Sequence, residues 1–194
     1  MLYFPHVATT FCNRRGDSEM IEKKVELKLR DPAIIYVDWA NVYGWRKSLP
    51  REVDTKELFE YFKKYPEIKE MRFYFGEDAH GKSRDFLAKI REIGYSLVSK
   101  PVKHILVAQI DGQKIYRRKC DFDMEISIDV HRVLQEGTES FIFLSGDGDF
   151  APLYRLLVEK KKQVVVVYAR KHIGREIWDM KQGIFKVQIT HLGL

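Results

Sequence analysis

The most distinctive stretch of the sequence is FLSGDGDFAPL at residues 143–153, where two aspartates follow an apolar run. Asp147 and Asp149 lie two residues apart, and Asp38 follows a second apolar run, AIIYV, in the same way. Side chains that follow buried parallel strands lie at the edge of the sheet where such folds bind ligands. The three carboxylates are therefore expected to share one site.

A fourth carboxylate, Asp123, lies in the expected first turn of a helix within DFDMEISIDVHRVLQEG. Carboxylates gathered in a small volume repel one another strongly unless a cation is bound between them. Mg²⁺ and Mn²⁺ favour carboxylate and water oxygens, and they activate water for attack on a phosphodiester. Asp38, Asp123, Asp147 and Asp149 are therefore predicted to bind Mg²⁺ or Mn²⁺.

Each of these aspartates also has an ordinary structural explanation when it is taken alone. SGDGDF is compatible with a polar turn in which Asp149 caps the following helix. Asp38 fits a turn, and Asp123 fits the acidic preference of a helix N-terminus. Their combination with Asp147 at one edge favours a metal site. Asp129 falls on the buried stripe of its helix, where it either supports the site or binds a backbone group or an arginine elsewhere.

The elements that must position these residues alternate between strand and helix. Strands are predicted in AIIYVD, MRFYFGE, YSLVSKPV, SFIFLSGD, QVVVVYA and FKVQIT, and the first and fourth of these are expected to be buried. Helices are predicted between them, one with Asp54 as its N-cap and one ending at Gly94. Two alternating runs around Asp111 and Gly112 predict a β-hairpin over residues 103–118. The fold class is therefore α/β, a mostly parallel sheet flanked by helices on both faces, with a hairpin insertion.

The 194 residues fit one globular domain, expected over residues 31–194 after an N-terminal extension of residues 1–30. MIEKKVELKLR in this extension is compatible with a short helix or an added edge strand. No apolar run reaches the ~18 residues needed to span a membrane. Two cysteines far apart favour a reducing cytoplasm, and the net charge of +6 favours nucleic acid as a partner.

Cations suited to holding RNA phosphates are expected near the same edge of the sheet. The predicted RNA-binding residues are Arg117, Arg118, Lys119, Arg170, Lys171 and Arg175. Such runs are also common as solvated surface charge. Trp39, Tyr43 and Trp45 flank the first acidic segment, where aromatic side chains either stack on bases or pack in the core.

Three segments, YVDWANVYG, KCDFDMEISIDV and LSGDGDFAPL, resemble in this order the signature blocks of NYN domains. The resemblance is to the LabA-like branch of the PIN-like nuclease superfamily, and it covers roughly residues 33–190. By motif it extends to Asp38, Asn41, Lys119, Asp123, Asp129, Ser145, Asp147 and Asp149. It implies a PIN-like fold and an acidic site for Mg²⁺- or Mn²⁺-dependent RNA cleavage. Trp39 and Cys120 depart from the pattern, but neither removes a metal ligand.

The predicted function is metal-dependent hydrolysis of phosphodiester bonds in single-stranded or structured RNA. Asp38, Asp123 and Asp147 are expected to ligate the ions, and Asp149 completes the ligand shell or orients the attacking water. Asn41 is predicted to hydrogen-bond a carboxylate or a phosphate oxygen. The resemblance implies products with a 5′-phosphate and a 3′-hydroxyl.

Ser145 and Asp129 are expected to support the metal-binding aspartates without binding the ion themselves. Lys119 is expected to neutralise charge near the scissile phosphate. Two other functions stay open. A non-catalytic module would use the same basic edge to hold RNA or a protein partner. A small-molecule phosphatase or nucleotide hydrolase is disfavoured, because the sequence has no glycine-rich phosphate loop. The hairpin is expected either to shape substrate entry or to form the edge of a homodimer.

Overall fold

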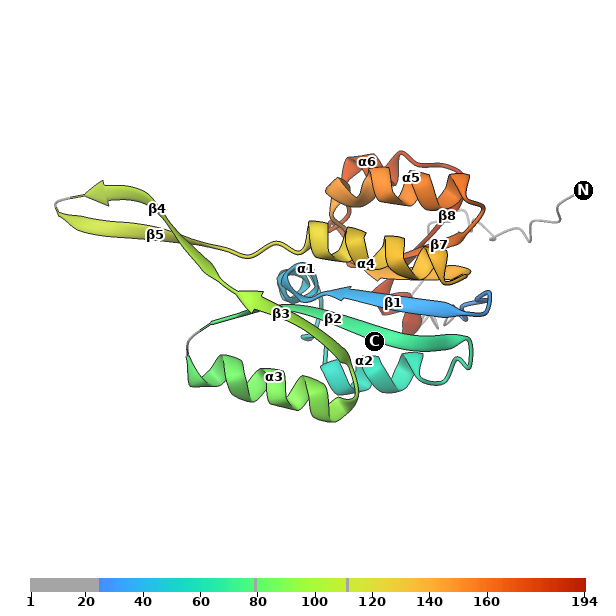
Figure 1. Cartoon of the computed structure of the whole chain (residues 1–194), viewed down its shortest axis with the longest axis horizontal. Helices are drawn as coiled ribbons and strands as arrows, with labels where there is room; N and C mark the ends of the chain where they lie inside the picture. Colours follow the sequence, from blue (N-terminus) through green and yellow to red (C-terminus); the bar gives the residue numbers. More distant parts are fainter. Residues whose placement is uncertain (1–24, 79, 111) are drawn as a thin grey trace, which may run out of the picture.

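The computed structural model describes residues 25–78, 80–110 and 112–194. Over these residues, six neighbouring strands form one parallel sheet in the order β3-β2-β1-β6-β7-β8 (Figure 1). The strands are β1 (Ala33–Asp38), β2 (Ile68–Glu77), β3 (Ser96–Pro101), β6 (Ser140–Leu144), β7 (Gln163–Tyr168) and β8 (Ile184–Gln188). The parallel sheet predicted from the apolar runs is confirmed.

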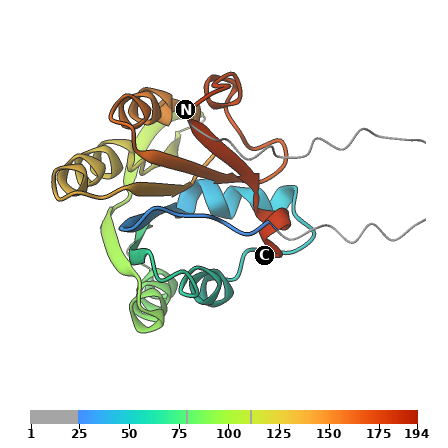
Figure 2. The same ribbon diagram turned by 90° about the vertical axis from the view of Figure 1, so that its right-hand side faces the viewer.

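Helices cover both faces of this sheet (Figure 2). On one side lie α2 (Thr55–Phe62) and α3 (Gly81–Ile93), and on the other lie α4 (Asp123–Gln135) and α5 (Ala151–Glu159). The shorter helical elements are α1 (Trp39–Gly44), α6 (Arg175–Trp178), and the 3₁₀ turns η1 (Trp45–Lys47), η2 (Gly148–Phe150) and η3 (Ile189–Leu192). The predicted α/β class with helices on both faces is confirmed.

The two faces of β1 show why the strand is apolar throughout. Successive side chains of a strand point to opposite faces. Ile35 and Val37 pack with α2, whereas Tyr36 packs with α4 and α5. Both faces of β1 are therefore buried, so none of its first five residues could carry a solvated carboxylate. The first carboxylate, Asp38, is the residue at which the strand ends.

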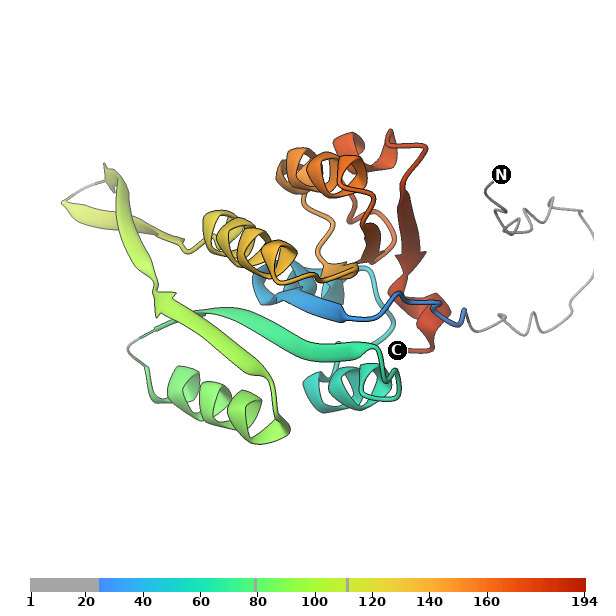
Figure 3. The ribbon, with the colours of Figure 1, turned by 45° about the vertical axis from the view of Figure 1, so that its right-hand side comes forward.

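Strands β4 (Lys103–Ile110) and β5 (Gln113–Lys119) form the predicted antiparallel hairpin, which projects away from the sheet (Figure 3). Asp111 of the predicted turn lies outside the described residues. The predicted caps are also present: Asp54 accepts hydrogen bonds from the backbone N–H groups of Lys56 and Glu57, and Gly94 ends α3 with a φ of 114°.

Two local features differ from the sequence expectation. Helix α1 follows β1 directly and was not anticipated. Residues 25–30 form neither the helix nor the edge strand considered for the extension. The backbone N–H of Arg30 instead bonds to the side chains of Ser140 and Gln163, so the segment is anchored without a strand ladder. The rest of the predicted extension, residues 1–24, lies outside the described residues.

The order of the strands creates a switch point between β1 and β6. From β1 the chain continues to β2 and β3 on one side, and it later returns to place β6 on the other side of β1. Ligands of open α/β sheets bind beyond the carboxyl ends of the strands at such a point. Asp38 ends β1, and Ser145 and Asp147 follow β6. None of the described helices is long and apolar enough to cross a membrane.

Candidate active site

A buried serine links the Asp38 carboxylate after β1 to the backbone of the loop after β6. Ser145, only 2% exposed, donates its hydroxyl to Asp38 Oδ2 at 3.3 Å. The same Ser145 Oγ accepts from the backbone N–H of Asp147, also at 3.3 Å. Asp38 Oδ1 accepts from the backbone N–H of Asn41 at 3.4 Å, which caps α1. The ends of β1 and β6 are thus joined side by side through Ser145.

Asp147, rather than Asp149, provides the cap of the turn that precedes α5. Its Oδ1 accepts from the backbone N–H of Asp149 at 3.0 Å. The residue that caps α5 itself is Phe150, which offers no side-chain acceptor. The alternative in which Asp149 caps the following helix is therefore wrong, and the Asp149 side chain is exposed.

Asn41 connects α1 to the acidic loop, which is the segment 145–149 that follows β6. Its Oδ1 accepts from the backbone N–H of Gly146 at 3.1 Å and from the indole Nε1 of Trp45 at 2.9 Å. Within the described part of the chain, its Nδ2 group forms no hydrogen bond, so this half of the amide stays available for a ligand. Asn41 therefore positions the loop that carries Asp147.

Asn41→Ala is expected to lower the free energy of unfolding by about 1–3 kcal/mol, because two N–H groups lose their acceptor, one of them on the fully buried Trp45. Urea denaturation measures this change. Tyr43→Ala, in the same helix at a side chain that is 49% exposed, is the control and is expected to cost less than about 1 kcal/mol. Equal stability of Asn41→Ala and the wild type would contradict the positioning role.

Burial and neighbouring negative charge raise the pKa values of Asp38 and Asp123. Burial raises the pKa of Asp38 to about 6, and the negative charges of Asp123 and Asp147 act in the same direction. The pKa of Asp123 is raised first by burial and then by Asp147, Asp121 and Asp149. These side chains therefore lie within electrostatic reach of one another, and a bound cation would relieve their repulsion.

The donor set fits a hydrated divalent ion. Among the described residues, no three His, Cys, Asp or Glu side chains converge closely enough to hold a metal by themselves. Mg²⁺ commonly keeps several waters and contacts only one or two carboxylates. The buried hydroxyl of Tyr154 has no hydrogen-bond partner among the described residues, and Asp38 and Asp147 are close enough to raise its pKa further. Water around an ion would supply the missing partner.

Asp129 lies away from this edge, between the sheet and α4. It accepts from the Tyr74 hydroxyl at 2.8 Å, and it forms ion pairs with Arg72 at 3.5 Å and Arg132 at 3.2 Å. Of the two roles considered for this residue, its contacts correspond to pairing with arginines elsewhere.

The predicted RNA-binding cations fall into two exposed groups. Arg117, Arg118 and Lys119 lie on β5, where Arg118 pairs with Asp78 at 2.8 Å and Lys119 with Asp121 at 3.2 Å. The second group, Arg170, Lys171 and Arg175, lies between β7 and the start of α6. All six side chains are exposed.

Glycines bring the second group close to the acidic loop. The backbone N–H of Gly174 donates to Gly146 O at 2.7 Å. A Cβ atom at Gly146 would collide with the carbonyl of His172, and one at Gly148 would collide with the carboxylate of Glu176. The loops after β6 and β7 therefore pack directly on each other. Glu176 is thereby added to the acidic edge, the carboxyl end of the sheet that carries Asp38, Asp123, Asp147 and Asp149.

Sequence reasoning missed two charged residues of this site, Glu176 and Lys100. Lys100, the second-last residue of β3, pairs with Glu125 at 2.5 Å, and its charge opposes the rise in the pKa of Asp123. Both residues follow or end strands of the same sheet. Their position at the carboxyl edge is the signal that could have identified them.

Comparisons with known proteins identify the fold and the family of the chain. No curated protein matches the chain. The crystal structure of a protein of unknown function from Vibrio parahaemolyticus is similar, with a TM-score of 0.61 and 22% sequence identity over 84% of this chain and 96% of that chain. At this identity the similarity shows the fold alone. The sequence model described as NYN domain matches residues 32–184, well over half of the chain. The chain therefore belongs to the NYN domain family, within the PIN-like nuclease superfamily.

Proposed function

We propose that this chain is a metal-dependent ribonuclease of the LabA-like branch, which hydrolyses RNA phosphodiester bonds at the acidic edge. One observation carries the proposal: Ser145 joins Asp38 and Asp147 at the switch point of the sheet, with Asp123 within electrostatic reach. Buried carboxyl groups whose pKa values are raised by burial and by nearby negative charge, as those of Asp38 and Asp123 are, are typical of a cation site.

Asp38, Asp123 and Asp147 would hold Mg²⁺ or Mn²⁺, directly or through water. When bound, such an ion supplies positive charge for a phosphate oxygen and lowers the pKa of water. Ser145 holds the Asp38 carboxylate beside the backbone of Asp147, since its hydroxyl donates to Asp38 and its oxygen accepts from Asp147 N–H. The exposed Asp149 carboxylate orients the attacking water or completes the ligand shell.

Positive side chains around the edge would neutralise the RNA backbone. Lys119 is proposed near the scissile phosphate, and Arg118 extends the basic surface onto the hairpin. Arg170, Lys171 and Arg175 are proposed as phosphate contacts on the other side, because their loop packs on the acidic loop. The products would carry a 5′-phosphate and a 3′-hydroxyl.

A cytoplasmic location is part of the proposal, because the two cysteines lie far apart in the sequence. A homodimer formed through the hairpin is also proposed. The structural support is the exposed aliphatic side chains of Ile105, Leu106 and Val107 on β4. Sedimentation of the full chain tests this association.

Removal of divalent ions is expected to abolish cleavage. The assay incubates labelled single-stranded RNA and a hairpin RNA with the wild type in Mn²⁺, in Mg²⁺ and in EDTA. Cutting in either ion that stops in EDTA and returns when the ion is added back supports the proposal. Undiminished cleavage in EDTA would refute it, and binding without cleavage in all conditions would favour the non-catalytic module.

A further inference from the structure

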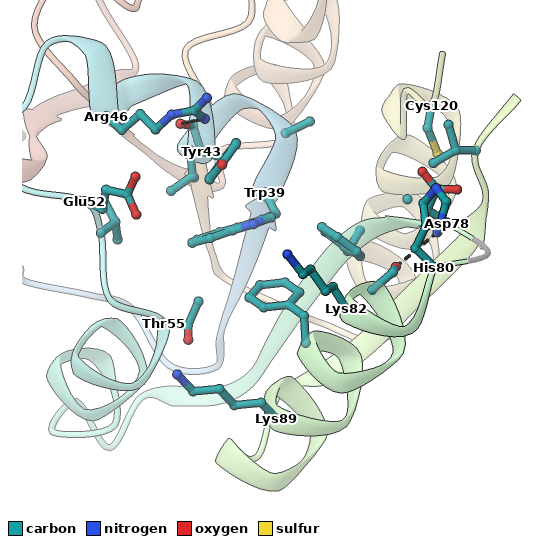
Figure 4. Close-up of a pocket in the computed structure, with 18 of the residues that line it drawn as sticks. Trp39, Tyr43, Arg46, Glu52, Thr55, Asp78, His80, Lys82, Lys89 and Cys120 are labelled. Carbon is teal, nitrogen blue, oxygen red and sulfur yellow. Dashed lines mark hydrogen bonds between the residues drawn. The ribbon is translucent and has the colours of Figure 1, made fainter. Parts of the chain in front are cut away.

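A groove of about 1110 Å³ opens beside the acidic edge, on the α3 side of the sheet (Figure 4). Tyr43 and Arg46 of α1 and η1 line one wall, and Lys82 and Lys89 of α3 line the opposite wall. Arg118, at the base of the hairpin, also lines it. None of the four predicted metal-ligand aspartates lines this groove, so it is a separate surface.

One wall carries a stacked aromatic ring and guanidinium. The Arg46 guanidinium carbon lies 3.7 Å from the centre of the Tyr43 ring, and its Nη1 donates to the Tyr43 carbonyl at 3.1 Å. Among the described residues, no carboxylate forms an ion pair with Arg46. Trp39 and Trp45 are buried and serve packing, whereas Tyr43 is 49% exposed. Unpaired bases stack on such rings and guanidinium planes.

The opposite wall carries two lysines on one face of α3. Lys82 and Lys89 are seven residues apart, about 10 Å along the helix axis. Figure 4 shows both ammonium groups directed from α3 toward the α1 and α2 side of the groove. The spacing suits an extended ligand that carries more than one negative charge.

Most carboxylates of the groove are already engaged. Asp54 accepts from two backbone N–H groups of α2, and Asp78 pairs with Arg118 at 2.8 Å. Glu52 is the remaining acidic side chain among the residues that line the groove. Asp54 keeps its negative charge, because these hydrogen bonds and the nearby Lys89 lower its pKa. The groove is lined by four cationic and three acidic side chains, so it carries an excess of one positive charge.

We propose that this groove binds single-stranded RNA, with a base stacked on the Tyr43–Arg46 pair and backbone phosphates held by Lys82 and Lys89. Trp39, the residue after Asp38, is one of the residues that line the groove, so an RNA strand held there would pass close to the acidic edge. A duplex keeps its base faces stacked inside the helix and cannot use the Tyr43–Arg46 pair. The inference rests on the proposed function, because it names the form of RNA that reaches the acidic edge.

The test measures binding of a fluorescein-labelled ten-nucleotide oligouridylate to the full chain in EDTA by fluorescence anisotropy. Tyr43→Ala is expected to weaken binding about tenfold, whereas Tyr43→Phe keeps the ring and stays within about twofold of the wild type. Lys82→Ala with Lys89→Ala is expected to weaken binding and to reduce the slope of log affinity against log salt by about 1.4.

Arg155→Ala with Lys160→Ala removes the same charge from α5 and its C-cap, on the other face of the sheet, and serves as the matched control. It is expected to leave the salt slope unchanged. An equal loss in this control, or an equal effect of Tyr43→Ala on a ten-base-pair RNA duplex, would overturn the proposal. Tight binding of an oligoglutamate that Tyr43→Ala leaves unchanged would also overturn it, in favour of an acidic peptide.

The assignment of the groove and the proposed nuclease activity can be refuted independently of each other. If groove variants lose oligouridylate binding in a protein that never cleaves RNA, the groove assignment stands and the nuclease proposal is refuted. If groove variants cleave single-stranded RNA with an unchanged KM, the nuclease stands and the groove assignment is refuted.

Discussion

Asp147→Asn is expected to reduce metal-dependent RNA cleavage about 100-fold or more while the fold stays intact. Asp147 is proposed as a metal ligand, and asparagine lacks the negative charge that attracts the ion. The amide Oδ1 of asparagine can still accept from the backbone N–H of Asp149, which preserves the turn before α5. The substitution therefore separates the chemistry of the carboxylate from its structural role.

The measurement combines a cleavage time course, Mn²⁺ binding by calorimetry and a thermal unfolding curve. The control is Asp121→Asn, which also removes one negative charge from the acidic edge but from a side chain that is 56% exposed and paired with Lys119. The control is expected to stay within about threefold of wild-type activity, because exposed pairs contribute little. Full activity of Asp147→Asn would refute the assignment of this residue.

Asp38→Asn is expected to remove activity and yet stabilise the metal-free protein at neutral pH. Burial raises the pKa of Asp38 to about 6 in the folded state, above the ordinary value of 3.8. A raised carboxyl pKa contributes stability that is fully present below about pH 4 and is lost as the pH rises through about 6. At pH 7 the ionised Asp38 therefore destabilises the metal-free fold, by about 1–3 kcal/mol.

Asparagine stays neutral at every pH, so the stability gain of Asp38→Asn is expected at pH 7 and should vanish near pH 4. Urea denaturation in EDTA from pH 4 to 8 measures it. Glu60→Gln, which removes one charge from a side chain that is 61% exposed on α2, is expected to change stability little. A variant that is less stable than the wild type at pH 7 would contradict the prediction.

The same pKa predicts how metal binding depends on pH. A protonated carboxyl is a poor metal ligand, so Mn²⁺ affinity of the wild type is expected to fall as the pH drops below about 6. Addition of Mn²⁺ at pH 7 is expected to raise the stability of the wild type and to leave Asp38→Asn nearly unchanged. Together these measurements distinguish a site that keeps a buried charge for metal binding from a purely structural aspartate.

The sequence by itself determined the fold class and the position of the acidic residues along it. Continuous apolar runs predict buried parallel strands, and the caps at Asp54 and Gly94 are local signals that need no tertiary contact. The end of a strand is also a local property, which is why Asp38 and Asp147 could be placed at one edge.

Only the tertiary structure decided which groups meet across that edge. Ser145 bonds to Asp38 across 107 positions of the chain, and Asn41 bonds to Gly146 across 105. The approach of Glu176 depends on the packing of two glycine loops, and the partner of Asp129 depends on the neighbouring strand β2. Local periodicity describes single elements, whereas these contacts follow from strand order and loop packing. For the same reason, no sequence pattern predicted the groove, whose walls come from α1 and α3.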